Sequence, residues 1–360
     1  MRLVLEQRNL PISCLFDYEL PEDSVRIYRP LGEGAFGKVY LGEYLKKEGC
    51  VFAVAIKAAR DPKNLNAKLE LLKEAEIMKQ FKHVNILRLI GVLTQHDKCQ
   101  IVTEFMMYGN LKDYLQDRRH LAAKQEINAT HLTRMAVDIS RGLTYLATLN
   151  YVHGDLACRN CLVHETLTIK LADFGFCKNL VDQNYNPVVY SGPMPVRWMS
   201  PEVLSTGVYH LQSDIWSFGV VLYEIITFGA HPYSTLDDYK VQDYIRSGGF
   251  PTLPQNVPSK LEALFLRIWS LNKDDRPSAL ELFEILTADP ELLHPSPEES
   301  PSRLGYISFE AQKRQSARSS FVIGSKWASI PKTQSLHKCA HNTKQGITFS
   351  ATQPTLLGIT

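Results

Sequence analysis

The sequence predicts an α+β protein of two parts, a small β-rich part followed by a larger, mainly helical part. Short β-like runs at residues 51–57 and 100–106 flank a single helical stretch in the first part. After residue 109 the composition turns helical, and residues 130–150 show the apolar spacing of an amphipathic helix. We therefore place a connection between two lobes at residues 104–109.

Changes of composition along the chain give its domain organisation. Residues 1–24 are mixed and turn-rich and form a lead-in segment, and residues 25–290 form the folded domain. Its N-terminal lobe covers 25–104 and its C-terminal lobe covers 110–290. Beyond residue 290 prolines alternate with Ser and Glu, no acid follows Glu310, and apolar periodicity is absent. This composition predicts that residues 291–360 form a disordered tail.

Composition and charge exclude several classes of function. The formal net charge of the chain is +2, whereas binding a nucleic-acid backbone needs a clustered basic surface. Seven scattered cysteines, an odd number, indicate a reducing compartment rather than a disulfide framework. The longest apolar run, residues 215–226, is too short to span a bilayer and contains Glu224. We therefore expect no nucleic-acid partner, and no signal peptide or transmembrane segment in this chain.

A glycine-rich motif, G-x-G-x-x-G-x-V, begins at Gly32 and has three interpretations. A dinucleotide-binding fingerprint requires an acid about 20 residues further on, where this chain has Lys57. A Walker A loop requires Ser or Thr after Gly-Lys, where this chain has Val39. The third interpretation is a hairpin lid over nucleotide phosphates, in which Gly32, Gly34 and Gly37 let the backbone approach the phosphates.

Lys57 ends an apolar run that should be buried on both faces, so its ammonium group needs a partner. The next helix, predicted at residues 66–81, places Glu74 in its apolar stripe, where a carboxylate is costly unless it is paired. An ion pair between Lys57 and Glu74 removes both costs. The alternative is an exposed Glu74, with Glu70 or Glu76 as the partner of the lysine.

Residues 151–163 form a loop with apolar ends that holds Asp155, Arg159 and Asn160 together. Such a loop suits phosphoryl transfer, because a carboxylate takes a hydroxyl proton, a cation neutralises phosphate and an amide oxygen holds a metal ion. Asp173 follows the next strand, and with Asn160 it offers oxygen ligands that suit magnesium bound to nucleotide phosphates. The alternative is that these are ordinary turn residues.

Together these motifs resemble the eukaryotic protein kinases over about residues 25–286, and the tyrosine-specific branch in particular. The glycine loop, the A-x-K that ends at Lys57, Glu74, the loop around Asp155 and the Asp-Phe-Gly at Asp173 follow the family's order and spacing. The resemblance implies the bilobal protein kinase fold, with ATP and Mg2+ as cofactors between the lobes. Within this branch, the sequence most resembles the cytoplasmic domains of receptor tyrosine kinases.

The resemblance also assigns roles to individual residues. The residues with catalytic roles are Asp155 as the base for the acceptor hydroxyl, Lys57, Glu74 and Arg159, and those that bind magnesium are Asn160 and Asp173. The residues that contact ATP are Leu31, Gly32, Gly34, Gly37, Val39, Ala55, Lys57, Thr103, Glu104, Met106 and Leu162. Supporting positions are the interlobe stack of Met78, His153 and Phe174, the loop support Asp214, and the buried ion pair of Glu202 with Arg276.

The class of acceptor can be read from the catalytic loop. Serine/threonine kinases usually have Lys two residues after the catalytic Asp, whereas this chain has Ala157 there and Arg159 two residues further on, as tyrosine kinases do. Residues 195–199 match the wall that seats a flat phenol in tyrosine kinases. The resemblance therefore implies protein substrates with tyrosine acceptors, SH2-type readers of phosphotyrosine and a dimer for trans-autophosphorylation. The alternatives are a pseudokinase scaffold and a serine/threonine or dual-specificity kinase.

One departure from the family affects regulation. Gly154 stands where the family usually has an arginine that docks the phosphorylated activation segment. Tyr185 and Tyr190 are the candidate phosphosites, and Tyr185 lies at the expected distance from Asp173. We expect activity to depend only weakly on phosphate at Tyr185. The expected location is cytoplasmic, with membrane association if the chain is part of a receptor.

Overall fold

In the computed structural model of the chain, the described residues are 15, 17–34, 37–46, 49–59, 61, 63–95, 98–122, 124, 126–181 and 194–296. Both lobes belong to one compact unit, Met1–Tyr44 with Ala53–Ser300. The stretch Leu45–Phe52 belongs to a second unit, and its described part includes a turn in which the N–H of Lys46 donates to the Cys50 carbonyl at 2.9 Å. Tyr185 and Tyr190 lie outside the described residues.

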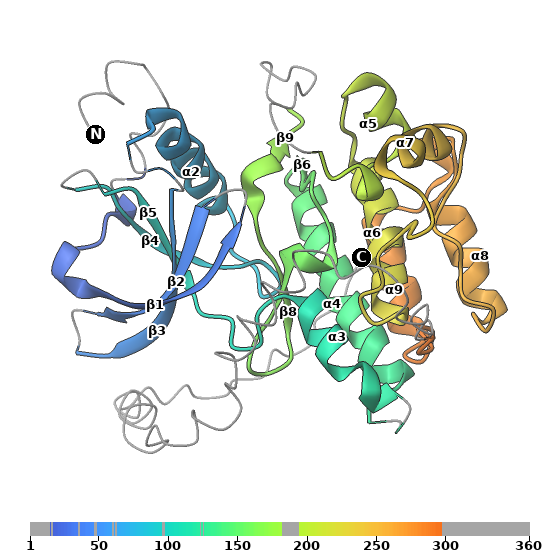
Figure 1. Cartoon of the computed structure of the whole chain (residues 1–360), viewed down its shortest axis with the longest axis horizontal. Helices are drawn as coiled ribbons and strands as arrows, with labels where there is room; N and C mark the ends of the chain where they lie inside the picture. Colours follow the sequence, from blue (N-terminus) through green and yellow to red (C-terminus); the bar gives the residue numbers. More distant parts are fainter. Residues whose placement is uncertain are drawn as a thin grey trace, which may run out of the picture. The chain divides into compact units, whose positions relative to one another are not determined.

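A five-stranded sheet forms the N-terminal lobe, with strand order β1-β2-β3-β5-β4 (Figure 1). The strands are β1 Val25–Gly34, β2 Gly37–Leu45, β3 Val51–Ala58, β4 Leu89–Leu93 and β5 Gln100–Glu104. β3 and β5 pair antiparallel, with Ala55 opposite Thr103 and Lys57 opposite Ile101. Val54, Ile56 and Val102 lie in the core of the sheet, completely buried. This register places the lysine and the predicted adenine-contacting residues on neighbouring strands.

Helix α2, Leu65–Met78, packs against the N-terminal lobe and carries Glu74. It begins where the Asn64 side chain accepts hydrogen bonds from the backbone N–H groups of Asn66 and Ala67, at 2.9 and 3.3 Å, which satisfies two of the free donors of the first turn. Its buried face includes Leu72 and Ala75, and Glu74 lies between them. The carboxylate is therefore directed into the protein by helical geometry.

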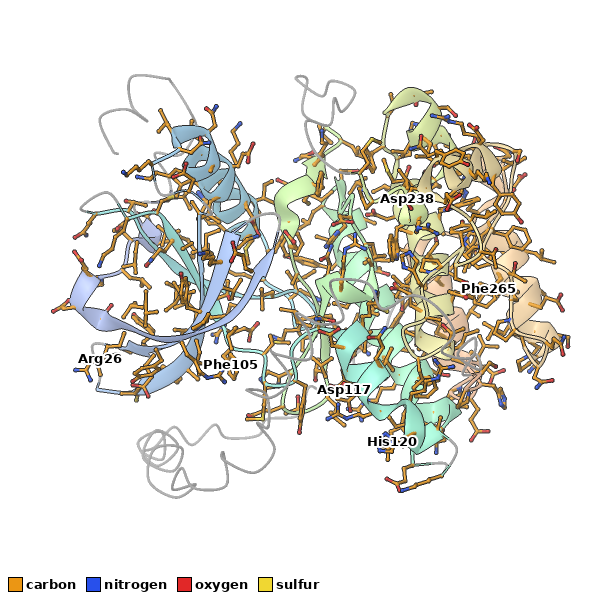
Figure 2. All side chains as sticks on the ribbon, in the orientation of Figure 1. Arg26, Phe105, Asp117, His120, Asp238 and Phe265 are labelled. Carbon is orange, nitrogen blue, oxygen red and sulfur yellow. The ribbon has the colours of Figure 1, made fainter. Side chains whose placement is uncertain are left out.

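The connection between the lobes leaves β5 at Glu104 and ends where α3 begins at Leu111. It docks on the C-terminal lobe through its backbone: the N–H of Tyr108 donates to the Val163 carbonyl at 3.2 Å, and the N–H of Val163 donates to the Gly109 carbonyl at 2.8 Å. Phe105, labelled in Figure 2, lies in this segment. The connection between β5 and α3 therefore consists of residues 105–110.

The C-terminal lobe is built around helices. They are α3 Leu111–Ala122, α4 Ala129–Thr148, α5 Pro201–Thr206, α6 Leu211–Ile226, α7 Asp238–Arg246, α8 Ser259–Ile268 and α9 Ala279–Ala288. Two small antiparallel ribbons carry the loops of the site, β6 Tyr151–Val152 with β9 Lys178–Asn179, and β7 Cys161–Val163 with β8 Ile169–Leu171. α6 is buried at every position from Ser213 to Ile226, as expected of a helix that is apolar on all sides.

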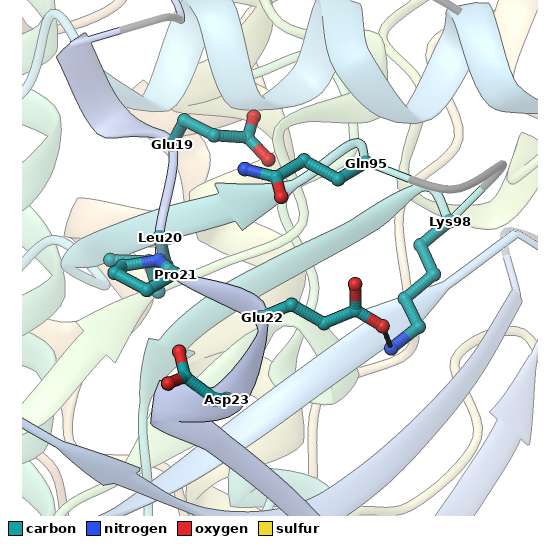
Figure 3. A pocket seen from close by; sticks show the side chains of 7 residues that line it. All are labelled: Glu19, Leu20, Pro21, Glu22, Asp23, Gln95 and Lys98. Carbon is teal, nitrogen blue, oxygen red and sulfur yellow. Dashed lines mark hydrogen bonds and ion pairs between the residues drawn. The ribbon is translucent and has the colours of Figure 1, made fainter.

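The described part of the lead-in segment packs on the sheet. Glu19 bridges to Val92 in a parallel arrangement, and the N–H of Leu20 donates to the Val92 carbonyl at 2.9 Å. A Cβ at Gly91 would lie 2.5 Å from Leu20 Cγ, so the glycine makes room for this segment. Figure 3 shows the open hollow of ≈ 780 Å³ beside it, where Glu22 pairs with Lys98. The lead-in is therefore a further edge of the N-terminal lobe.

Packing also continues past residue 290. Leu292 and Leu293 are buried, and the N–H of Leu293 donates to Thr133 Oγ1 in α4 at 3.0 Å. The N–H of Ser296 donates to the carbonyl of Ile226, the last residue of α6, at 2.8 Å. Residues 291–296 thus belong to the C-terminal lobe rather than to the predicted tail, and residues 297–360 lie outside the described part of the chain.

The α+β, two-lobed architecture predicted from the sequence is confirmed, with an antiparallel sheet in one lobe and helices in the other. No helix among the described residues is long and apolar enough to cross a membrane.

A buried ion pair joins two distant parts of the C-terminal lobe. Arg276, which is 5% exposed, donates to both carboxylate oxygens of Glu202 at 2.8 and 2.9 Å. It also donates to the carbonyl of Ser270 at 2.9 Å. The planar guanidinium therefore fixes the start of α5 against the segment that precedes α9.

We predict that Arg276→Met lowers the free energy of unfolding by about 3 kcal/mol, because it leaves the Glu202 carboxylate without its partner. Arg267→Met is the matched control, because Arg267 forms an exposed pair with Glu281 and its loss should cost about 1 kcal/mol or less. Urea unfolding of both variants measures the difference. Equal losses for the two variants would contradict the proposed role of burial.

Candidate active site

Lys57 and Glu74 form a buried ion pair. Lys57 Nζ lies 2.8 and 2.7 Å from the two Glu74 carboxylate oxygens and 3.4 Å from Asp173 Oδ1. Burial lowers the pKa of Lys57, but the charges of Glu74 and Asp173 outweigh it and leave the pKa above its ordinary value, so the ammonium group stays charged. The alternative partners are excluded, because Glu70 is exposed and Glu76 pairs with Lys79.

The catalytic loop gathers two polar side chains around one carboxylate. Asn160 Nδ2 donates to Asp155 Oδ2 and to the Asp155 carbonyl, both at 2.7 Å. Arg159 donates to Asp155 Oδ1. Each oxygen of the carboxylate thus has one donor, which fixes its orientation. Burial raises the pKa of Asp155 to about 6, and the positive charge of Arg159 opposes that rise.

Two buried acids of α6 support this loop from below. Asp214 accepts hydrogen bonds from the backbone N–H groups of His153 at 2.6 Å and Gly154 at 3.0 Å. Glu224 Oε2 accepts from the Cys158 N–H at 2.9 Å and from Trp198 Nε1 at 3.0 Å. These bonds satisfy loop donors that would otherwise be buried without partners. The loop is therefore anchored to the most deeply buried helix of the protein.

Asp173 is held in a left-handed backbone conformation, with φ of 64° and ψ of 75°. A non-glycine residue adopts this conformation only where its surroundings enforce it. The next residue, Phe174, is completely buried, and its ring lies 5.3 Å from that of His153 and 5.2 Å from that of Phe81. The buried phenylalanine thus fixes the turn that presents Asp173, while Met78 is also buried nearby in the same core.

A pocket of ≈ 220 Å³ lies where these groups converge. Ten predicted site residues line it: Gly37, Val39, Ala55, Lys57, Glu74, Thr103, Arg159, Asn160, Leu162 and Asp173. The predicted residues that are not part of its lining are Leu31, Gly32, Gly34, Glu104, Met106 and Asp155. Asp155 contacts the pocket through its bonds to Arg159 and Asn160.

Four apolar residues also line the pocket without having been predicted to contact ATP: Met78, Leu87, Ile101 and Ala172. For three of these residues, the sequence spacing from a predicted site residue could have indicated that they line the pocket. Met78 follows Glu74 by one helical turn, and Ile101 precedes Thr103 by two residues on one strand face. Ala172 directly precedes Asp173. Leu87 lies in a loop, and no periodicity pointed to it.

Glu104 has a side-chain role that the sequence did not reveal. Its Oε1 accepts hydrogen bonds from Lys170 Nζ and from the backbone N–H of Arg88, both at 2.8 Å. Lys170 lies in β8, the strand that leads to Asp173. The side chain of Glu104 therefore links the connection between the lobes to the segment that carries Asp173.

The donor set of the pocket fits magnesium held together with nucleotide phosphates. No three His, Cys, Asp or Glu side chains gather into a metal cluster within the described ranges. Asn160 uses its amide nitrogen for Asp155, so its amide oxygen is the atom left for a cation, and Asp173 adds a carboxylate. Mg2+ prefers such oxygen donors, and it takes the rest of its shell from water and phosphate.

A flat wall adjoins the catalytic loop on its other side. The guanidinium of Arg159 lies over the Trp198 ring, 4.3 Å from its centroid. The preceding residue, Arg197, donates to Asp238 at the start of α7 and to the carbonyls of Pro232 and Leu236. The cation that contacts Asp155 is thus positioned by an aromatic face, and that face is fixed to α7.

Gly154 adopts a conformation that favours glycine. Its φ is 78°, and a Cβ built on it would lie 2.7 Å from the Phe176 carbonyl oxygen. An L side chain in the left-handed region costs about 1–2 kcal/mol before any such contact is counted. The sequence indicated only the loss of an arginine. The structure adds that the glycine lets the catalytic loop pack closely on the Phe174–Phe176 turn.

Comparisons with known proteins agree with this site. Residues 25–286 match the family described as protein tyrosine and serine/threonine kinase. The chain belongs to this family. It is 36% identical over 280 residues to an insulin receptor of Xenopus laevis, covering 76% of this chain and 20% of that protein. It is 33% identical over 343 residues to an insulin-like growth factor 1 receptor of Bos taurus, covering 92% and 54%, respectively.

A third relative is an insulin-like peptide receptor of Branchiostoma lanceolatum, 35% identical over 302 residues, covering 77% of this chain and 22% of that protein. The chain thus spans about a fifth of the length of the first receptor that it matches. The family and these relatives support a protein-tyrosine kinase, and they do not favour a pseudokinase.

We predict that kcat/KM for a tyrosine peptide falls about tenfold per pH unit below the pKa of Asp155, because a protonated carboxyl cannot accept the phenol proton. That pKa is about 6, so activity should rise with pH through this value. Arg159→Gln should move the acid limb to higher pH, since it removes the charge that lowers this pKa. A pH–rate profile at saturating Mg-ATP measures both.

The control for this profile is Arg267→Gln, a change of an exposed arginine of α8. It should leave the acid limb where it is. An acid limb that stays in place in Arg159→Gln would refute the assignment of this limb to Asp155.

Proposed function

We propose that this chain transfers the γ-phosphoryl group of ATP to tyrosine hydroxyls of proteins, including its own. The observation that carries the proposal is the convergence of two buried polar clusters on one pocket, Lys57 with Glu74 and Asp173, and Asp155 with Asn160. Five side chains from four separate segments meet there. A loop or an ion pair with a purely structural role would not require both clusters at the same pocket.

Asp155 is the residue that takes the proton of the acceptor phenol. Its two oxygens are oriented by Arg159 and Asn160, so one remaining lone pair can face the incoming hydroxyl. A raised pKa suits a base that must accept a proton near neutral pH. The Arg159 guanidinium, lying on Trp198, forms a flat surface that accommodates a phenol ring beside the base.

Lys57, Asn160 and Asp173 hold the phosphate end of ATP. The Lys57 ammonium pairs with the phosphates, and Glu74 keeps it in place. Asn160 and Asp173 would hold magnesium, which would supply positive charge to neutralise the charge that develops on the phosphates. Val39, Ala55, Leu162 and the other apolar lining residues enclose the adenine, with Thr103 at the back of the pocket.

Partners and location follow as further proposals. Acceptor tyrosines on proteins are the substrates, SH2-type domains read the products, and two copies associate for trans-autophosphorylation. The named receptors to which the chain is similar favour a site at the cytoplasmic face of a membrane. The retained Lys57, Asp155 and Asp173 argue against the pseudokinase alternative, which Gly154 alone favours.

Asp155→Asn is expected to lower kcat for a Glu/Tyr polymer by about 10²–10⁴-fold, because it removes the base and keeps the shape. ATP binding, measured by titration with and without magnesium, should stay close to that of the unchanged chain. Phosphoamino-acid analysis should find phosphotyrosine alone. Undiminished transfer by Asp155→Asn, or phosphoserine as the main product, would rule out the proposed mechanism or the acceptor class, respectively.

We predict that phosphate at Tyr185 changes turnover only slightly, because Gly154 lacks the side chain that would bind it. One charged hydrogen bond is worth about 1.5–3 kcal/mol, and that contribution is missing here. The measurement compares kcat of the unphosphorylated chain, the phosphorylated chain and Tyr185→Phe. A difference of about 10²-fold in kcat between the phosphorylated and unphosphorylated chains corresponds to the energy of such a bond. It would show that another group binds the phosphate.

A further inference from the structure

Tyr239, in the first turn of α7, is the most exposed tyrosine of the described residues, with 67% of its surface accessible. The side chains of the other exposed tyrosines contact a neighbouring carboxylate or aromatic ring. Tyr28 donates a hydrogen bond to Glu43, Tyr244 packs edge-on against another tyrosine ring at 6.1 Å, and Tyr108 does the same at 5.7 Å. The Lys240 ammonium group lies 5.4 Å from the centroid of the Tyr239 ring.

Acidic residues directly precede Tyr239. The side chains of Asp237 and Asp238 are 70% and 76% exposed. The substrate side of the site carries the positive charge of Arg197, the residue before Trp198. Arg159 adds to this field from the catalytic loop itself. An acceptor tyrosine that follows two carboxylates is therefore electrostatically complementary to this site.

The backbone around Tyr239 lies at the very start of α7. The carbonyl of Asp237 accepts hydrogen bonds from the N–H groups of Lys240 and Val241, both at 2.9 Å. Opening this first turn breaks those two bonds and the bond from Arg197 to Asp238, and leaves the later turns of α7 in place. Tyr244 lies in the middle of the same helix, so presenting it would disrupt several more bonds.

The first turn of α7 is also connected to the catalytic loop. Asp238, labelled in Figure 2, accepts a hydrogen bond from Arg197 Nε at 2.9 Å. The next residue, Trp198, lies beneath Arg159, which bonds the base Asp155. A new charge beside Asp238 competes for Arg197 and so acts on the wall that seats the acceptor.

We propose that Tyr239 is a phosphate-acceptor site, modified by the active site of a second copy of this chain, and that its phosphate weakens the binding of peptide substrates. The proposal rests on the proposed tyrosine kinase function. The Tyr239 oxygen forms a bond to the γ-phosphorus of ATP, the bond to the bridging oxygen breaks, ADP leaves, and the phenol proton passes to Asp155. The second copy is required because Arg197 fixes this turn to its own chain.

The test uses two forms of the full chain. Tyr239→Phe serves as the enzyme, and Asp155→Asn, whose own transfer should be about 10²–10⁴-fold slower, serves as the substrate. Phosphate on Tyr239 then arises mainly by transfer between copies, and mass spectrometry of tryptic peptides locates it. Tyr244 on the same substrate chain is the matched control, because it too follows an aspartate.

We expect Tyr239 to be labelled at least about tenfold faster than Tyr244, a difference of about 1.4 kcal/mol in barrier. A Glu/Tyr polymer assayed in parallel reports kinase activity by itself. Labelling of the polymer without labelling of Tyr239, or equal labelling of both tyrosines, overturns the proposal and leaves the proposed function intact. Failure to label the polymer overturns both.

The effect of the phosphate is measured as KM for a tyrosine peptide. Prior incubation with Mg-ATP should raise KM of the unchanged chain about two- to fivefold, the range expected for one exposed charge contact. Tyr239→Phe should show no such rise, while Tyr244→Phe should behave like the unchanged chain. An equal rise in Tyr239→Phe would assign the effect to another site and overturn the coupling.

Discussion

The architecture of this kinase depends on one partly buried cation. Lys57 ends an apolar strand of the sheet, and the protein can keep its ammonium group charged only by supplying carboxylates. One comes from α2 and the other from the segment after β8, so satisfying the lysine fixes a helix and a loop of the other lobe. The electrostatic requirement of one side chain thereby sets the relative position of three elements.

Beneath the catalytic loop the arrangement is reversed. The buried charged groups are acids, and backbone N–H groups supply their hydrogen-bond partners. Asp214 and Glu224 lie in α6, which is buried at every position from Ser213 to Ile226, and accept hydrogen bonds from N–H groups of the catalytic loop. Burial raises the pKa of Asp214 to about 7, and the two N–H donors oppose the rise. The catalytic loop, which has only the short 3-10 helix Cys158–Asn160 between β6 and β7, gains the rigidity that a base needs from the helix beneath it.

The lobes and the ion pair of Lys57 with Glu74 could be predicted because buried charges and periodic apolar positions leave few arrangements. The side-chain role of Glu104 could not, since an acid at a strand end gives no sign of its partner. Leu87 escaped prediction because loop residues lack periodicity. The positive φ of Gly154 was also hidden, because the sequence shows a missing side chain and not the backbone conformation that favours it.

The packing of the lead-in shows that the domain boundary inferred from the family is not the boundary of stable folding. The match begins at residue 25, yet Leu15 and Leu20 are buried and Leu20 pairs with β4, the last strand of the sheet. A protein shortened to the matched region would bare that strand's unpaired carbonyl and amide groups. Exposed strand edges pair with other chains and promote aggregation. Truncation at the matched boundary should therefore lower the solubility of the protein.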